Sequence, residues 1–489
     1  MYYVGLDIGT SSLKCVVIDT VCDIVYEHGY SYAFDEPREG YREIDPDVWF
    51  QAVLHALQDI HEKFDGINIS TIGVTGQMHT TVFLDAQGKS VRKAIMWNDL
   101  RSSDMVAPLK ERLAKREDTK YIAKILSTGS PAMNTLWVKE QEPEVFLKVR
   151  KIMTAYDYIV YRLTGEYSSD YCDASTSSMY DIVSKQWSGY MLDILGIDDH
   201  YLGPIYASCD IVGTLREELC EQLRINKRIK VIAGTGDNPA NAVAMGVLDQ
   251  QQPVLSLGTS GVIILAKEDK DFEGLGKNVV FNAQHDRFVN VVQGTVRSAG
   301  GTHKWWVENI VESSDMGIDQ DRLRNACGKE HHILFFPHIT GDKMIYQDIN
   351  TRGAFIGLSA NSKREDMLQA VFEGVGYALR EVMENMHLKA WPKRMQINGG
   401  GTRSDVWMNI MANILHCELE EVSMNASPGY GVALLAGKVD GIEKKESQKT
   451  TGKVYVPCDN QVNIYEKQYR KYQRMYGALK EIMENEPLK

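Results

Sequence analysis

The chain has 489 residues, of which 44% are hydrophobic and 25% are charged. This composition is typical of soluble globular proteins and excludes disordered, collagen-like and disulfide-scaffold classes. The formal net charge is −12, and no cluster of Lys or Arg interrupts the acidic balance, so we expect no nucleic-acid partner.

The N-terminus begins directly with an apolar, β-prone run at residues 2–6. It has no basic region followed by an apolar stretch, so we expect no signal peptide. No run of about 18 apolar residues predicts a membrane span. The eight cysteines are scattered without a Cys-x-x-Cys pair, which indicates reduced thiols rather than a zinc site. Together these features predict a cytoplasmic protein without a membrane partner.

A strand–turn–strand pattern occurs twice, about half the chain apart. Residues 4–18 and residues 254–265 both place β-branched runs on either side of a Gly-Thr-Ser turn, which is typical of a strand pair. The repeat favours a duplicated domain with a boundary near residues 245–253. The two copies differ chemically, because Asp7 in the first corresponds to Ser256 in the second.

Two more glycine-rich turns follow predicted strands. The apolar strand 228–233 leads into residues 234–239, where Asn238 is expected to cap a helix that begins at Pro239. The strand 396–398 leads into a triple glycine and a helix capped by Ser404 or Asp405. The apolar face of that helix has 3.6-residue spacing and contains Val406, Trp407, Ile410, Met411, Ile414 and Leu415.

Further helices are predicted in the second half. Ser362 and Glu365 are spaced as a capping box for a long helix. Near the C-terminus one helical face carries Tyr465, Tyr469, Tyr472, Tyr476 and Leu479, and we interpret this stripe as packing rather than as a cofactor site. The mixed order of strands and helices predicts an α/β protein whose sheets are covered by helices.

Four glycine turns could bring backbone N–H groups close to an anion. They are residues 9–12, 234–238, 258–261 and 399–404. None matches a Walker motif or a dinucleotide-binding fingerprint. Two carry an acid, Asp7 and Asp237, and phosphoryl transfer needs a carboxylate for a metal and a base for the attacking hydroxyl. From the spacing alone, Asp237 is either such a base or only part of a helix cap.

Taken together, these motifs resemble the FGGY family of carbohydrate kinases, within the actin-like ATPase superfamily. The resemblance runs nearly end to end and is carried by residues 5–11, 236–238, 257–261 and 399–404. It implies an α/β fold of two ribonuclease-H-like domains that flank a catalytic cleft. Residues 1–245 would form the mainly sugar-binding lobe and residues 246–489 the mainly ATP-binding lobe. It also implies that Asp237 is the catalytic base.

Within the family, residues 76–79 and 95–99 are most similar to those of xylulokinases. This similarity implies transfer of the γ-phosphoryl group of ATP to the terminal hydroxyl of a pentulose, D-xylulose. The sugar would contact Met78, His79, Trp97, Asp237 and Asn238.

The resemblance also implies the ATP and metal sites. ATP would lie near Gly9, Thr10, Ser11, Thr259, Ser260, Gly300, Gly301, Gly400 and Gly401. For Gly300 and Gly301 the alternative stays open that they only begin a helix and bind no ligand. Mg²⁺ would bridge the phosphates and be held through Asp7, by way of water because magnesium dehydrates reluctantly. The small-molecule partners implied are the sugar and ATP. Whether the protein also forms a homodimer stays open.

Two departures from the family pattern bear on the substrate. Thr80 stands where a small glycine is usual and is expected to crowd the sugar pocket. Residues 335–345 stand where relatives usually carry a Gly-Glu-Arg-Thr-Pro segment. Asp342 and Lys343 keep its two charges without the proline, but Asp is shorter than Glu and Lys does not reproduce the bidentate contacts of Arg. Gluconate, another pentulose or a polyol therefore stay open as substrates. The alternative that is not an enzyme of sugar metabolism is a nucleotide-gated regulatory protein. The presence of Asp237 together with Met78 and His79 argues against this alternative.

Overall fold

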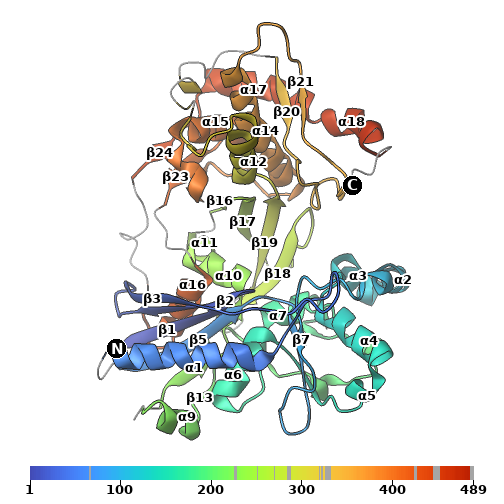
Figure 1. Ribbon diagram of the computed structural model, residues 1–489, viewed down its shortest axis with the longest axis vertical. Coiled ribbons are helices and arrows are strands. Elements are labelled where there is room, and N and C mark those ends of the chain that lie inside the picture. Colours follow the sequence, from blue (N-terminus) through green and yellow to red (C-terminus); the bar gives the residue numbers. More distant parts are fainter. Residues whose placement is uncertain are drawn as a thin grey trace.

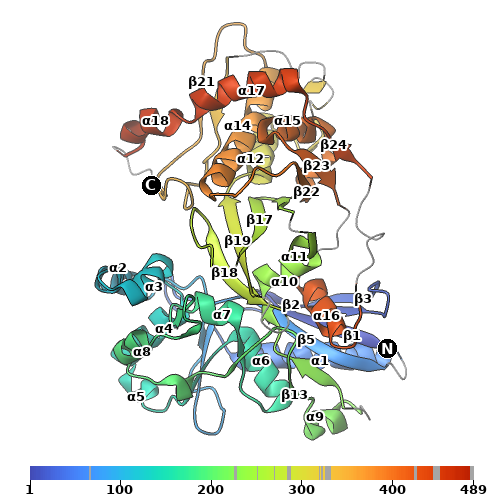
Figure 2. The ribbon, with the colours of Figure 1, turned by 180° about the vertical axis from the view of Figure 1, so that it is seen from behind.

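The computed structural model describes residues 1–64, 68–224, 228–250, 252–268, 270–283, 288–318, 320, 323–324, 332–422, 427–443 and 452–484. Two lobes are stacked along the long axis of the molecule, with the N-terminal half in the lower lobe of Figure 1. The upper lobe comes from the second half of the chain. The lobes meet where β18 (Lys277–Asn282) contacts α7 (Tyr171–Thr176), as both ribbon views show (Figures 1 and 2).

The first lobe is built on a sheet with the strand order β13-β14-β5-β1-β2-β3. An antiparallel meander of β1 (Tyr2–Ile8), β2 (Ser12–Ile18) and β3 (Ile24–Ser31) is followed by two strands parallel to β1, namely β5 (Ile69–Gly76) and β14 (Lys230–Ile232). Side chains alternate along β1, so Val4, Leu6 and Ile8 enter one core with α1 (Pro46–Lys63) and α6 (Ala155–Thr164). Asp7 therefore lies on the opposite face.

The second lobe repeats this arrangement in the order β18-β19-β17-β16-β22-β23-β24. Its meander consists of β16 (Val254–Leu257), β17 (Gly261–Glu268) and β19 (Phe288–Val296), and the parallel strands are β22 (Arg394–Asn398) and β23 (Glu418–Glu421). The strand pairs predicted at residues 4–18 and 254–265 are thus confirmed, and each opens an equivalent sheet. The edges of this sheet are β18 and β24 (Val454–Tyr455).

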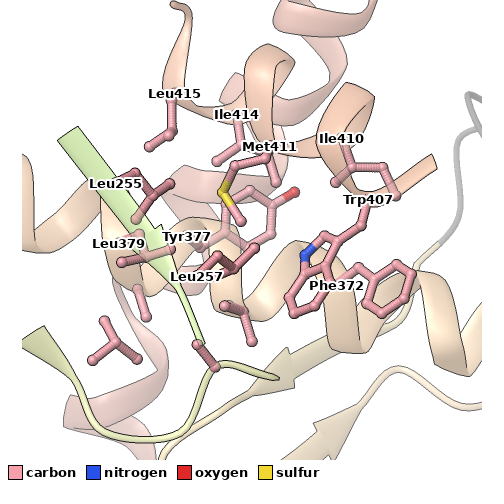
Figure 3. Packing of buried hydrophobic residues seen from close by; sticks show 14 of the residues in the cluster. Leu255, Leu257, Phe372, Tyr377, Leu379, Trp407, Ile410, Met411, Ile414 and Leu415 are labelled. Atoms are coloured by element: carbon pink, nitrogen blue, oxygen red, sulfur yellow. The ribbon is translucent and has the colours of Figure 1, made fainter. Parts of the chain in front are cut away.

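The core of the second lobe lies between this sheet and two helices, α14 (Arg364–Asn385) and α15 (Asp405–Leu415). The predicted apolar face of α15 is buried, and Figure 3 shows it beside Leu255 and Leu257 of β16. The Phe372 and Trp407 rings stack with centroids 4.5 Å apart. Ser404 caps α15 as predicted, because its hydroxyl accepts a hydrogen bond from the Trp407 N–H.

Two predicted helix starts are wrong by one or two residues. The cap of α14 is Lys363, whose N–H is bound by Asp366, whereas the Ser362 hydroxyl accepts from the Ser359 N–H in the preceding turn. Helix α10 (Asp237–Ala244) begins at Asp237 and not at Pro239. Its N-cap is Gly236, and no side chain caps it. Competing local hydrogen bonds decide such boundaries, which spacing alone does not show.

The tyrosine stripe is confirmed as packing. It spans two helices, α17 (Asp459–Tyr472) and α18 (Met475–Glu484), and Tyr465, Tyr469 and Tyr472 are buried in the core of the second lobe. The Tyr469 hydroxyl donates to a carboxylate oxygen of Glu384 at 2.7 Å, which satisfies its polar end inside the core.

Helix α16 (Pro428–Lys438) belongs to the second half of the chain but packs on β1, β2 and β5 of the first lobe. Glycines allow this close approach: a Cβ on Gly5 would lie 1.9 Å from the Gly429 carbonyl oxygen, and one on Gly431 would lie 1.8 Å from that of Ala240. The predicted domain boundary at residue 245 stays a prediction. Because α16 packs on the first sheet, the packing of side chains does not separate the chain into two parts at that residue alone.

An insertion enlarges the first lobe directly after residues 76–79. Its sheet has the order β4-β7-β6-β8, with strands Glu43–Ile44, Ala94–Ile95, Thr81–Leu84 and Lys151–Thr154. The helices around it are α2 (Ser103–Ala114), α3 (Lys120–Ile125), α4 (Pro131–Gln141), α5 (Pro143–Phe146) and α8 (Gly189–Leu195).

Shorter elements complete the fold. The strands are β9 (Ser169–Asp170), β10 (Tyr180–Asp181), β11 (Gln186–Trp187), β12 (Ile205–Tyr206), β13 (Ile211–Thr214), β15 (Thr235–Gly236), β20 (Leu334–Phe336) and β21 (Ala354–Ile356). The helices are α9 (Glu217–Gln222), α11 (Val247–Gln250), α12 (Gly300–Trp305) and the turn Gly400–Arg403. Within the described ranges, no helix has both the length and the apolarity to cross a bilayer. Seven described cysteines are free and five of them are buried; Cys327 lies outside the described residues.

Candidate active site

The two acids singled out by the sequence lie at the same edge of the first sheet. Asp7 is paired with Thr75 near the end of β1, and Thr75 is in turn paired with Thr235 of β15. Asp237 follows β15 directly. Because β1, β5 and β15 are parallel, their carboxyl ends meet at one edge, which is where ligands bind in open α/β sheets. The fold therefore brings Asp7 and Asp237 together.

The electrostatics of this pair favour binding of a cation. Burial, together with the nearby Asp237, raises the pKa of Asp7 to about 7, against a lowering by Lys14, its partner across β1 and β2. Burial also raises the pKa of Asp237, which Lys277 and local backbone N–H groups lower in part. Two buried carboxylates that disfavour each other's charge are a donor set that suits a hard divalent cation. The residues present thus fit Mg²⁺ at Asp7.

The predicted sugar contacts gather beside Asp237. Met78 and His79 lie two and three residues after the end of β5, and His79 has a left-handed backbone with φ of 71°. Non-glycine residues adopt this conformation rarely and often at functional sites. The Asn238 amide lies 3.6 Å from the Met78 sulfur, which the thiol of Cys172 also approaches at 4.0 Å. The fold places Met78, His79, Asp237 and Asn238 in one group.

Trp97 links this group to the first glycine turn. Its ring nitrogen donates to the Thr10 hydroxyl at 3.1 Å, and its backbone N–H donates to the Thr80 hydroxyl at 3.1 Å. Thr80 in turn donates to Gln77. The buried Thr80 side chain holds Gln77 and Trp97 in place, and the expected crowding of the sugar pocket by Thr80 stays a prediction. Trp97 itself is 47% exposed.

Glycine turns of the second lobe also gather at one sheet edge. The Gly300 and Gly301 N–H groups donate to the carbonyls of Gly258 and Thr259, so α12 begins against the turn that contains Thr259 and Ser260. A Cβ on Gly401 would lie 2.4 Å from the Leu257 side chain, whereas Gly400 faces open space. Among these predicted ATP contacts, Gly400 is open to an approaching ligand. The N–H groups of Gly300 and Gly301 are already hydrogen-bonded to the preceding loop.

The unusual segment around Asp342 makes its contacts inside the second lobe. Asp342 is buried; its carboxylate accepts hydrogen bonds from the N–H groups of Met344, Tyr346 and Gln347. Burial opposes ionisation, but His338 and these N–H groups prevail and lower the pKa of Asp342. Thr340 contacts Arg297 and Ser298, just before α12, so the segment supports the loop that leads into this helix. Lys343 is exposed.

Four residues of the group were not assigned a role from the sequence. Gln77 donates to the Gly9 carbonyl at 3.2 Å, Cys172 contacts Met78, Lys14 faces Asp7, and Lys277 approaches His79 at 3.2 Å. Gln77 lies inside a recognised motif, and Lys14 could have been found from the hairpin register. Cys172 and Lys277 arrive from distant parts of the chain and carry no local signal.

The family models match both halves of the chain. The N-terminal domain of the FGGY family of carbohydrate kinases matches residues 2–244, and the C-terminal domain of the same family matches residues 254–438. The chain belongs to the FGGY family of carbohydrate kinases. As a member, it is an ATP-dependent carbohydrate kinase with the two-domain, actin-like α/β fold predicted from its motifs.

Individual relatives cover almost the whole chain. A xylulose kinase from Lactococcus lactis is 31% identical over 494 residues, which cover 98% of this chain and 97% of that protein. A gluconokinase from Bacillus subtilis is 26% identical and covers 99% and 96%. The xylulose kinase structure from Rhodospirillum rubrum has a TM-score of 0.88 at 23% identity, over 99% and 100% of the two chains, a likeness that concerns the fold.

Proposed function

We propose that this FGGY kinase phosphorylates D-xylulose at its terminal hydroxyl, giving D-xylulose 5-phosphate and ADP. The observation that carries the proposal is the grouping of Met78, His79 and Asn238 around Asp237 at the carboxyl edge of the first sheet. Similarity to the xylulose kinase from Lactococcus lactis supports the choice of sugar.

In the proposed reaction Asp237 is the general base. Its carboxylate accepts the proton of the terminal hydroxyl as that oxygen bonds to the γ-phosphorus, and the bond to the ADP oxygen breaks. Phosphoryl transfer depends mainly on positioning and charge stabilisation. Mg²⁺, when bound through Asp7, would supply positive charge to the phosphates. Lys277 helps keep Asp237 ionised, since it lowers the pKa that burial raises.

Met78 and His79 would orient the sugar. Burial, together with Lys277, lowers the pKa of His79 well below its usual value, so the imidazole is neutral at pH 7 and can both donate and accept. The Met78 thioether offers a soft surface for the C–H face of the sugar. A site that pairs specific hydroxyls discriminates strongly against analogues that lack them.

The nucleotide would lie across the glycine turns of both lobes. On the first lobe these are Gly9, Thr10 and Ser11, and on the second lobe Thr259, Ser260, Gly400 and Gly401, with Gly300 and Gly301 supporting the turn. Cytoplasmic location and assembly as a homodimer stay predictions.

ADP release measured against a panel of sugars tests the proposal. We expect the highest kcat/KM for D-xylulose, with gluconate, other pentuloses and glycerol much poorer. A higher kcat/KM for gluconate or a polyol would overturn the choice of sugar but not the kinase activity. Slow ATP hydrolysis that no sugar accelerates would favour the nucleotide-gated regulatory protein instead.

A further inference from the structure

One side chain at the proposed sugar site comes from the second lobe. Lys277 is the first residue of β18, a strand of the second sheet. Strand β18 extends far enough to contact α7 of the first lobe, where the Val280 N–H donates to the Ser175 hydroxyl at 3.1 Å. At its other end the Ser208 N–H donates to the Asn282 carbonyl at 2.8 Å. These hydrogen bonds hold β18, and with it Lys277, against the first lobe.

Lys277 is directed at His79. Its ammonium nitrogen lies 3.2 Å from the Nε2 atom of His79. An ammonium group has no acceptor capacity, so the imidazole must accept at Nε2 and carry its proton on Nδ1. This is consistent with the neutral state of His79. The contact therefore selects one tautomer of the residue that we expect to bind the sugar.

The ammonium group retains donors for a ligand. It has three N–H bonds, and in the described part of the chain its side-chain hydrogen bond is to His79. The residue is exposed, on the side where Asp237 also lies within electrostatic range. A polyhydroxylated ligand that contacts His79 would bring an oxygen within reach of Lys277.

We infer that Lys277 binds the sugar substrate, so that the sugar site is completed by a residue of the second lobe. This inference rests on the proposed function for the location of the sugar. The ammonium donates to a hydroxyl or carbonyl oxygen next to the one bound by His79. The sugar would then contact both lobes at once, and the docked β18 strand becomes part of substrate recognition.

A second lysine provides the comparison. Lys124 also joins the lobes, because its ammonium nitrogen lies 3.5 Å from the carbonyl oxygens of Phe272 and Gly274. It is exposed, and the hydrogen bonds of its ammonium group go to these backbone carbonyls and not to Met78, His79, Asp237 or Asn238. Replacement of Lys124 therefore removes a lysine contact between the lobes without removing a side chain of the proposed sugar site.

The test compares Lys277→Met, Lys277→Arg and Lys124→Met with the wild type. A lost hydrogen bond from a charged donor corresponds to about a 10- to 100-fold weaker interaction. We expect Lys277→Met to raise KM for D-xylulose by this factor while KM for ATP changes by less than about twofold. Lys277→Arg should recover part of the loss because it keeps a charged donor, and Lys124→Met should keep both constants. Calorimetric binding of D-xylulose without ATP should weaken in parallel.

The outcomes distinguish a failure of this inference from a failure of the proposed function. If the wild type phosphorylates no sugar of the panel, the proposed function fails. If the wild type uses D-xylulose and a folded Lys277→Met variant keeps its sugar KM and sugar affinity, the role of Lys277 is wrong. An equal rise of both KM values in Lys277→Met and Lys124→Met would assign Lys277 to lobe docking instead. Thermal unfolding of each variant verifies that it is folded.

Discussion

Asp237 stands at the point where strand β15 ends and helix α10 begins, and its proposed role as base depends on its charge. Asp237→Asn keeps the size of the side chain but removes its basicity. Because the helix is not capped by this side chain, the fold should survive. We expect kcat to fall by about 10²- to 10⁴-fold, the range for a lost general base. Steady-state kinetics with D-xylulose measure this, and near-normal turnover in a folded Asn variant would rule the assignment out.

Asp7 and Ser256 occupy equivalent positions in the two repeats, but only Asp7 carries a charge for a metal. We expect Asp7→Asn to abolish most Mg²⁺-dependent turnover and to leave sugar binding largely intact. Ser256→Ala is the matched control and should have a mild effect. Mg²⁺ titration of the rate, with calorimetry for the sugar, distinguishes the two. An unchanged rate and Mg²⁺ dependence in Asp7→Asn would contradict the metal role.

Among the elements, α16 depends on close backbone approach, because it crosses from the second half of the chain to the first sheet. A Cβ at Gly431 would lie 1.8 Å from the Ala240 carbonyl of α10, so Gly431→Ala forces the two helices apart. Overpacking of this kind costs about 1–3 kcal/mol, and we expect a lower midpoint of thermal unfolding.

Gly477→Ala is the control for the Gly431→Ala substitution. Gly477 also lies in a helix, α18, and a Cβ there meets nothing within 4 Å. Alanine in an open helical position stabilises by up to about 1 kcal/mol, so its midpoint should stay or rise. If both variants unfold at the same temperature, the close approach of α10 and α16 does not limit stability.

At the scale of the whole molecule, three buried acids make stability depend on pH. Asp157, Asp170 and Asp173 lie inside the first lobe, and burial together with Asp170 raises the pKa of Asp157 to about 8. The folded state then holds a proton that the unfolded state releases above its ordinary pKa of 3.8. The stabilising contribution is complete below about pH 4 and is lost as the pH rises toward about 8.

Asp157→Asn should remove part of this dependence, since an amide does not titrate. We expect the unfolding midpoint of the wild type to fall more steeply between about pH 5 and pH 8 than that of the variant. Thermal unfolding across this range measures both slopes. Parallel slopes would mean that Asp157 is ionised in the folded protein.

The sequence by itself determined the structural features that depend on residues close together in the chain. Both Gly-Thr-Ser hairpins, the Ser404 cap, the buried face of α15 and the tyrosine stripe follow from turn chemistry and periodicity, which act over a few residues. The repeat also predicted a duplicated domain, and Asp7 and Asp237 were found as the two acids at glycine turns. The motifs then allowed the family to be named, because such a set at such spacings is specific.

Only the tertiary structure decided which distant segments meet. The contact of Lys277 with His79 joins residues 198 positions apart, and the docking of α16 on β1 depends on glycines whose partners lie hundreds of residues away. The position of Thr80 beneath Trp97 likewise depends on how two strands of the inserted sheet pack. Such contacts are selected by the shape and register of whole sheets and helices, and no local preference for hydrogen bonding or burial encodes them.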